Sequence, residues 1–274
     1  MSTAHAAPAA GRRVTLLTDF GTADGYVAAM KGVIAAIDPS VIIDDASHDI
    51  PPGDVNAAAW ALGAYWRLYP PGTVHVAVID PGVGSTRRAL ALKVEQRVFI
   101  VPDNGIITDV LLHARLTQAI EIQAAGRSPA DVGSSREISA TFHGRDVFAP
   151  AAGRAASGVP LHELGVQTAD PLILPAATLE RDGDAITGAV VHVDRFGNLV
   201  TSIPATGVSG GHVVIDGGAK VPVLRTYSDV ENGEPLALAG SRGFLEVSIR
   251  NGSAAEVLRV GRGARVVWLR GSTT

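Results

Sequence analysis

One apolar run in the sequence ends in an acid, and two arginines follow it closely. The run VHVAVID (74–80) predicts a buried strand that ends at Asp80, where a Pro-Gly turn begins. Arg87 and Arg88 come next in VIDPGVGSTRRAL. Asp is a favoured turn residue, so Asp80 could simply cap the turn. Alternatively, it is a carboxylate exposed at a strand end, where ligands bind in open α/β sheets.

A second predicted strand, VTLLTDF (14–20), also ends in an acid, Asp19, and Asp24 follows in the polar turn GTADGY. Two acidic strand ends in one sheet favour a site at that edge. The triplet Asp19-Phe20-Gly21 matches the kinase DFG motif, but no glycine-rich ATP loop or HRD-like loop accompanies it. Because neither GxGxxG nor a P-loop occurs, the sequence does not indicate a diphosphate-binding loop.

The eight histidines are scattered along the chain. No HExxH or HxH pair gives metal-ligand spacing, so we predict no metal site. His143 lies in the polar turn TFHGRD, and a lone histidine is more often solvated than catalytic. His192 lies in a strand pattern and is predicted to be structural, and we assign no role to His48 or His75.

Polar motifs in the second half of the chain could recognise a small molecule. VDRFGNLVTSI holds Asp194, Phe196 and Asn198, and an amide beside an exposed aromatic suits the edge of a flat base. GSRGF holds Ser241 and Arg242, and a guanidinium suits a carboxylate. Ordinary turn chemistry explains each motif equally well.

The elements that position these residues differ between the two halves. In the first half, apolar periodicity predicts strands over 14–20, 41–47 and 74–80, a hairpin over 89–103, and helices over 26–37, 54–69 and 107–114. This alternation predicts an α/β domain with a mostly parallel sheet covered on both faces.

After about residue 170 the pattern changes. A Pro- and Asp-rich segment, 170–184, reads as a linker, and only strand signals with Gly-containing turns follow. We therefore expect a disordered tail over 1–13, the α/β domain over 14–175, and a small antiparallel β-barrel domain over 176–274.

Composition excludes several classes of function. The chain has 274 residues, 46% hydrophobic and 18% charged, with a net charge of −4, which argues against a nucleic-acid-binding face. It has no cysteine, so disulfides and thiolate chemistry are excluded, and a reducing cytoplasm is the expected location. No apolar stretch approaches 18 residues, so we expect no membrane span.

The motifs together resemble a known family. LLTDFGTADGYVAAMKG, DIPPGDVNAAAW, HVAVIDPGVGSTRR, VPDNGI, TFHGRDVFAP, VDRFGNLVTSI and GSRGFLEV occur in this order. The chain resembles the S-adenosylmethionine (SAM) hydroxide adenosyltransferases, adenosine-forming SAM hydrolases related to the SAM-dependent fluorinase and chlorinase. The resemblance runs from about residue 14 to residue 268, and VIDPGVGSTRR with TFHGRD is its most specific part.

The resemblance implies a role for each matching residue. The set that handles the attacking water is Asp80, Arg87 and His143, with either His143 or Asp80 taking the proton. Asp19 is implied to hold the ribose hydroxyls. The residues around the methionine amino and carboxylate ends are Asp24, Asp194, Ser241 and Arg242. Those that line the adenine and ribose are Phe142, Asn198, Tyr227 and Asn251.

The implied reaction is hydrolysis of SAM to adenosine and L-methionine, with SAM as substrate and no cofactor. The family also implies a homotrimer whose active site is shared between subunits. The halogenases carry an aromatic residue near the position of Gly53 and lack the acid at Asp80, so both positions favour water over halide. The alternatives are a chlorinase-type halogenase, a non-catalytic SAM- or adenosine-binding module, and a metal-dependent phosphoesterase that uses Asp19 and Asp24.

Overall fold

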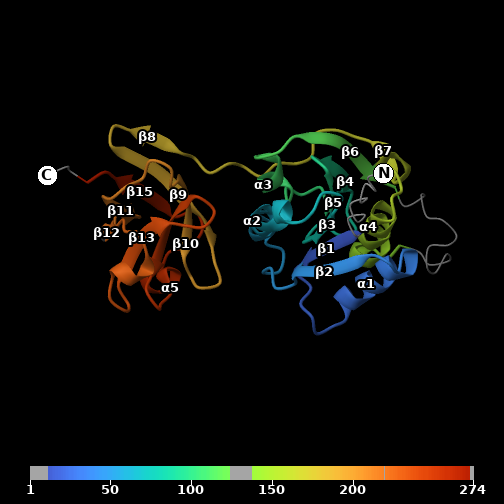
Figure 1. Cartoon of the computed structure of the whole chain (residues 1–274), viewed down its shortest axis with the longest axis horizontal. Helices are drawn as coiled ribbons and strands as arrows, with labels where there is room; N and C mark the ends of the chain where they lie inside the picture. Colours follow the sequence, from blue (N-terminus) through green and yellow to red (C-terminus); the bar gives the residue numbers. More distant parts are fainter. Residues whose placement is uncertain (1–11, 124–137, 219, 272–274) are drawn as a thin grey trace, which may run out of the picture. The chain divides into compact units, whose positions relative to one another are not determined.

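The computed structural model describes residues 12–123, 138–218 and 220–271, and the chain divides into two units, Met1–Leu174 and Pro175–Thr274 (Figure 1). Most of the tail expected over residues 1–13 lies outside the described residues. The first unit has two hydrophobic cores and the second unit has one.

The first unit is built on a seven-stranded sheet of order β2-β1-β3-β5-β4-β6-β7. The first four strands in this order are mutually parallel, and β4, β6 and β7 continue the sheet by antiparallel pairing. The strands are β1 (Arg13–Thr18), β2 (Ile42–Ser47), β3 (Val74–Val78), β4 (Ala89–Val94), β5 (Arg97–Pro102), β6 (Leu116–Ile122) and β7 (Gly165–Gln167).

Helices cover both faces of this sheet (Figure 1). Helices α1 (Tyr26–Ile37) and α4 (Ala149–Ala156) share one core with the strands, and α2 (Val55–Tyr65) and α3 (Thr108–Leu111) share the other. Because helices cover both faces, β3 is buried from Val74 to Val78. Strands buried on both faces have nearly continuous apolar sequences, which is the pattern found here. The predicted α/β architecture is confirmed.

Local chemistry sets the helix ends. The Asp54 side chain accepts a hydrogen bond from the Ala57 N–H at 3.0 Å and caps α2. The predicted helix over 54–69 is too long, because the chain tightens into the 3-10 turn η1 (Trp66–Leu68) before Pro70. The helix predicted over 107–114 is also shorter, whereas α1 has the predicted bounds.

The second unit is a nearly closed antiparallel barrel. Its sheet has the order β12-β11-β15-β9-β10-β14-β13, with β8 paired to β9, and a bridge between Val223 and Ala237 joins the two ends. The strands are β8 (Glu180–Asp182), β9 (Ala185–Val193), β10 (Leu199–Pro204), β11 (His212–Ile215), β12 (Lys220–Pro222), β13 (Pro235–Ala239), β14 (Phe244–Ile249) and β15 (Arg265–Leu269). The predicted barrel is confirmed.

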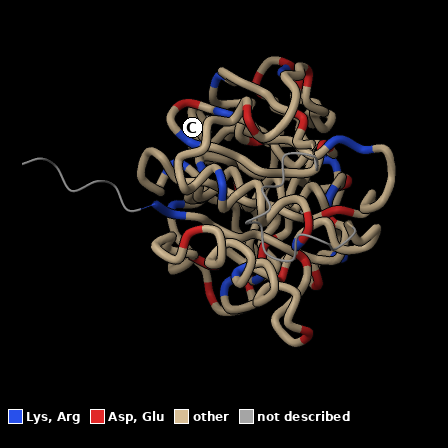
Figure 2. Tube along the Cα trace, turned by 90° about the vertical axis from the view of Figure 1, so that its right-hand side faces the viewer, with Lys and Arg blue, Asp and Glu red and all other residues tan. Residues whose placement is uncertain are grey.

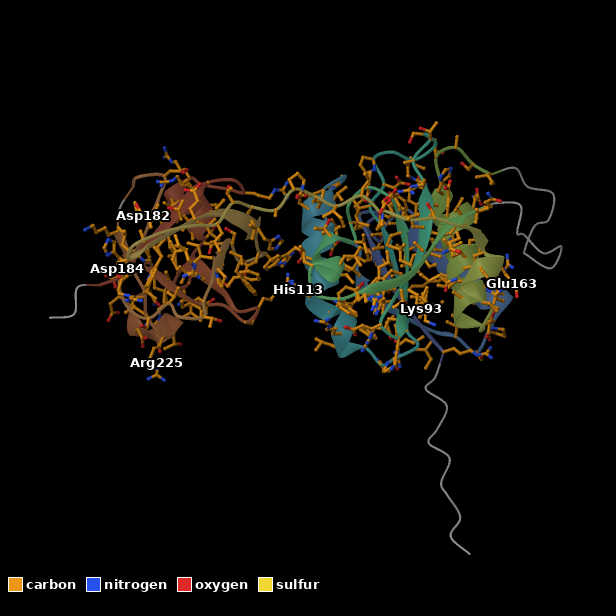
Figure 3. The ribbon with its side chains drawn as sticks, turned by 90° about the horizontal axis from the view of Figure 1, so that it is seen from above. Lys93, His113, Glu163, Asp182, Asp184 and Arg225 are labelled. Atoms are coloured by element: carbon orange, nitrogen blue, oxygen red, sulfur yellow. The ribbon has the colours of Figure 1, made fainter. Side chains whose placement is uncertain are left out.

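One expectation for this unit is wrong. The pattern of apolar residues and turns predicts strands alone, yet a short helix, α5 (Ala254–Leu258), follows β14. Ser253 caps this helix by accepting the Glu256 N–H at 3.2 Å, a local signal that outweighs the strand pattern. In the hairpin formed by β8 and β9, Asp182 and Asp184 flank the turn at the edge of the unit (Figure 3).

Charged residues are distributed rather than gathered. Figure 2 shows basic and acidic residues interspersed along the trace. Several form partly exposed pairs, such as Lys31 with Asp45 at 2.6 Å and Arg67 with Glu95 at 2.8 Å. Pairs of this kind contribute little to stability. None of the helices within the described ranges combines the length and apolar character that a bilayer crossing requires.

Candidate active site

A buried ion pair lies just beyond the carboxyl end of β3. The Arg87 Nε donates to both oxygens of Asp80, at 2.9 Å to Oδ1 and 3.1 Å to Oδ2, and Nη2 also donates to Oδ2. The two side chains are only 5% and 11% exposed, for Asp80 and Arg87 respectively. The acid at the strand end is therefore held by a guanidinium fork, which fixes its plane.

The same guanidinium reaches a third residue. Arg87 Nη2 lies 2.7 Å from Nδ1 of His143. A guanidinium has no acceptor, so Nη2 donates and Nδ1 must be unprotonated, which puts the hydrogen of the neutral ring on Nε2. Burial lowers the pKa of His143 below its ordinary value, and the charge of Arg87 lowers it further, while Asp80 and Asp146 act in the opposite direction.

A compact turn connects Asp80 to Arg87. The Val83 N–H donates to the Asp80 carbonyl at 3.1 Å, and the Arg87 N–H donates to Ser85 Oγ at 3.2 Å. Gly84 has a φ of +77°, and a Cβ there would clash with the carbonyl oxygen of Ala140. Glycine at this position therefore lets the turn lie directly against the segment that leads to His143.

His143 precedes a short π-helical segment, η3 (Gly144–Phe148). Wider turns of this kind occur often at functional sites. Asp146 accepts the Ser139 N–H at 2.9 Å and two bonds from Arg145, so the segments before and after His143 are tied together. These bonds hold the ends of the segment that carries His143.

Three aromatic rings form a cluster beside His143. The rings of Phe20, Tyr26 and Phe142 meet edge to face with centroid distances of 5.9, 6.0 and 5.0 Å. A Cβ at Gly144 would come within 3.1 Å of the rings of both Phe20 and Phe142, so the glycine permits this approach. Of the three, Phe142 is a predicted site residue, whereas Phe20 and Tyr26 are not among the predicted ones and are brought to it only by the fold.

Asp19 follows the end of β1. Its Oδ2 accepts the Gly53 N–H at 2.8 Å. Gly53 has a φ of +72°, which non-glycine residues rarely adopt, so an aromatic residue in this backbone conformation would be strained. Asp24 lies in the exposed turn before α1.

The second unit carries an open cavity of about 780 Å³. Three predicted residues line it together with Phe196 and Arg250: Asn198, Tyr227 and Asn251. This volume is within the range of sites that bind small molecules.

Two groups of this unit hold the cavity lining in place. Asp194 accepts both the Phe196 N–H at 2.8 Å and the Asn198 N–H at 2.9 Å, so its carboxylate organises the turn that carries them. The Tyr227 hydroxyl donates to Glu246 at 2.8 Å, and burial together with this acid raises the pKa of the phenol. Glu246 is not among the predicted site residues, and its only signal in the sequence is an acid inside the apolar strand pattern FLEVSI.

The remaining predicted residues of this unit, Ser241 and Arg242, lie in the turn between β13 and β14. The described residues contain no cluster of three or more His, Asp or Glu side chains suited to a metal ion.

Comparisons with known proteins cover both units. Residues 14–165 match the N-terminal domain model of the SAM hydroxide adenosyltransferases, and residues 188–267 match the C-terminal domain model. The chain is 41% identical to an (R)-S-adenosyl-L-methionine hydrolase of Thermus thermophilus, with 93% of this chain and 98% of that protein covered. It is 28% identical to a fluorinase of Actinopolyspora mzabensis, over 88% of this chain and 92% of that one.

Solved structures resemble most of the chain as well. An uncharacterised conserved protein from Thermotoga maritima aligns with a TM-score of 0.85 at 32% identity, over 94% of this chain and 100% of that one. A conserved hypothetical protein from Thermus thermophilus aligns with a TM-score of 0.79 at 38% identity, with the same coverage.

Proposed function

Because the chain belongs to the SAM hydroxide adenosyltransferase family, we propose that it hydrolyses SAM to adenosine and L-methionine. Water attacks C5′ of the ribose, the C5′–S bond breaks, and methionine leaves as a neutral thioether. The observation that carries this proposal is the chain of contacts from Asp80 through Arg87 to His143. These groups suit a water nucleophile. The thioether leaves from a sulfonium without being protonated by an acid, whereas neutral water is a poor nucleophile and needs activation.

Each member of this set has a distinct task in the proposed reaction. Arg87 supplies fixed positive charge that favours negative charge developing on the water oxygen. Its bond to Nδ1 puts the hydrogen of the neutral His143 ring on Nε2, and this Nε2–H can donate to the water and orient it. Asp80 then accepts the proton released as the C–O bond forms, a contribution of about 10²- to 10⁴-fold for general-base catalysis.

Substrate binding follows the family pattern in this proposal. Asp19 holds the ribose hydroxyls, and Phe142, Asn198, Tyr227 and Asn251 line the adenine and ribose. The methionine ends are held by Asp24, Asp194, Ser241 and Arg242. The family resemblance supports a homotrimer with an active site shared between subunits, and the lack of cysteine fits a cytoplasmic location. No cofactor is needed, since SAM is itself activated.

The test is an incubation of the purified protein with SAM in water enriched in ¹⁸O. We expect adenosine and methionine in equal amounts, with the label in the 5′-hydroxyl, and at least tenfold less product from Asp80→Ala. Absence of adenosine above a blank would refute the proposal. With added chloride, 5′-chloro-5′-deoxyadenosine would instead indicate a halogenase, and tightly bound, intact SAM would indicate a binding module.

A further inference from the structure

A buried histidine outside the set of Asp80, Arg87 and His143 lies against the strand end that carries Asp19. His48 follows β2 and is only 6% exposed. Its Nδ1 lies 2.8 Å from the hydroxyl of Thr18, a fully buried residue and the last of β1. The carbonyl of His48 accepts the Gly21 N–H at 2.9 Å. One residue therefore contacts the chain both before and after Asp19.

The hydroxyl of Thr18 has a second contact that completes this arrangement. It accepts the Phe20 N–H at 3.2 Å. Thr18, Phe20 and Gly21 are thus all fixed by bonds that involve Thr18 Oγ1 or His48, while the Asp19 carboxylate is fixed by the Gly53 N–H. These bonds hold the residues on both sides of Asp19, and the His48–Thr18 bond fixes the hydroxyl that accepts the Phe20 N–H.

The other side of the imidazole indicates the direction of this bond. Nε2 has no aligned hydrogen-bond partner among the described residues, but it lies 2.9 Å from Oδ1 of Asp45, which in turn pairs with Lys31. A ring nitrogen beside a carboxylate oxygen is favoured when it carries the hydrogen. In the neutral ring Nδ1 is then the acceptor, so the Thr18 hydroxyl donates to it.

We propose that His48, acting through Thr18, is a positioning residue that orients Asp19 for the vicinal hydroxyls of a ribose. This inference rests on the proposed function in one respect, the assignment of Asp19 to the ribose. A carboxylate reads two neighbouring hydroxyls only when its plane and distance are fixed. Loosening the strand end should therefore affect discrimination at the 2′-hydroxyl more than it affects the overall fold.

The structure offers a matched control for this idea. His75 and Thr15 form a second buried pair, with Nδ1 and Oγ1 also 2.8 Å apart, between β3 and β1. Thr15 lies three residues before Thr18, and its side-chain bonds within the described part of the chain go to Tyr65 and His75 rather than to the Asp19 turn. Thr15→Val removes the same chemical bond from the same sheet, so it reports purely structural effects.

The experiment measures the dissociation constants of adenosine and 2′-deoxyadenosine for the full chain by calorimetry. We expect the unaltered protein to prefer adenosine by about 10- to 100-fold, the value of one hydrogen bond to a charged group. Thr18→Val should reduce this preference to about threefold or less, whereas Thr18→Ser, which keeps the hydroxyl, and Thr15→Val should retain it.

Two substitutions of His48 provide a second, independent comparison. His48→Asn keeps a polar group near the Nδ1 position and should retain the preference, while His48→Gln moves it to the Nε2 position and should lose it. An unchanged preference in folded Thr18→Val and His48→Gln, or no preference in the unaltered protein, would overturn the inference. The binding measurements do not depend on turnover. If SAM stays intact on incubation while the adenosine preferences of the variants are as expected, the proposed hydrolysis is refuted and the role of His48 is retained.

Discussion

Arg87→Met tests whether the site is held together by a buried ion pair. The Asp80 and Arg87 side chains are 5% and 11% exposed, and three donor contacts join them. Methionine keeps much of the aliphatic length of arginine but has no donor. Asp80 would then lose the three donor contacts that hold it, and the His143 Nδ1 would lose its donor.

The magnitude follows from this burial. Removing one partner of a buried ion pair costs about 3–5 kcal/mol, because it leaves an uncompensated charge. Asp80→Asn in the same chain removes that charge, so the double variant should be more stable than Arg87→Met by at least about 2 kcal/mol. The two substitutions are therefore expected to be strongly non-additive, as is typical of residues in direct contact.

Urea unfolding at neutral pH, for the two single variants and the double variant, measures this coupling. Lys31→Met is the control, because the Lys31–Asp45 pair is 36% and 44% exposed and its loss should cost less than about 1 kcal/mol. Free energies of unfolding that add to within about 0.5 kcal/mol would refute the reasoning. Adenosine release from SAM should fall at least tenfold in all three variants at the active site.

Three further predictions concern pH and packing. Since burial and Arg87 lower the pKa of His143, kcat/KM for SAM should stay on its plateau as pH falls through 6.5 and decline only below it; a loss centred above 6.5 would contradict the geometry. Burial, with the nearby charge of Arg97, lowers the pKa of His75 from 6.5 to about 3. The unfolded state therefore binds a proton on this residue at a higher pH than the native state does. The free energy of unfolding should fall by about 2 to 3 kcal/mol between pH 7 and pH 4.5 for this reason. Chemical denaturation should show this slope in the unaltered protein and a flatter one in His75→Phe. Gly84→Ala should destabilise the chain by more than about 1 kcal/mol and reduce turnover, because φ is +77° and the added Cβ meets a carbonyl; an unchanged unfolding midpoint would contradict this.

The sequence predicts the elements that obey simple periodicity. The run from Tyr26 to Ile37 has helical spacing and a stop at Asp38, and α1 has those bounds. Residues 89–103 form the predicted hairpin, because a mostly apolar run lies on each side of the Glu95-Gln96 turn. Asp80 at a strand end could be predicted from the abrupt end of an apolar run.

Other features depend on contacts that no local pattern encodes. The π-helical segment after His143 is stabilised by Asp146 and its bonds to Ser139 and Arg145, and TFHGRD reads only as a polar turn. His48 has no local signal, since its partner Thr18 lies thirty residues earlier on a neighbouring strand. The roles of the residues in binding SAM stay predictions from the family resemblance.

The two adjacent arginines illustrate how a short loop can serve two tasks. Arg87 reaches Asp80 and His143, whereas Arg88 donates to Asp103 Oδ2 at 2.8 Å and to Thr168 Oγ1 at 2.8 Å. Successive side chains entering a strand point to opposite faces, so neighbours in sequence can pair with different partners. Arg88 thereby ties the segment after β7 to the loop that contains Asp80 and Arg87. In the proposed reaction, a change at Arg87 should thus lower the rate of the chemical step directly, while a change at Arg88 should first loosen the segment after β7.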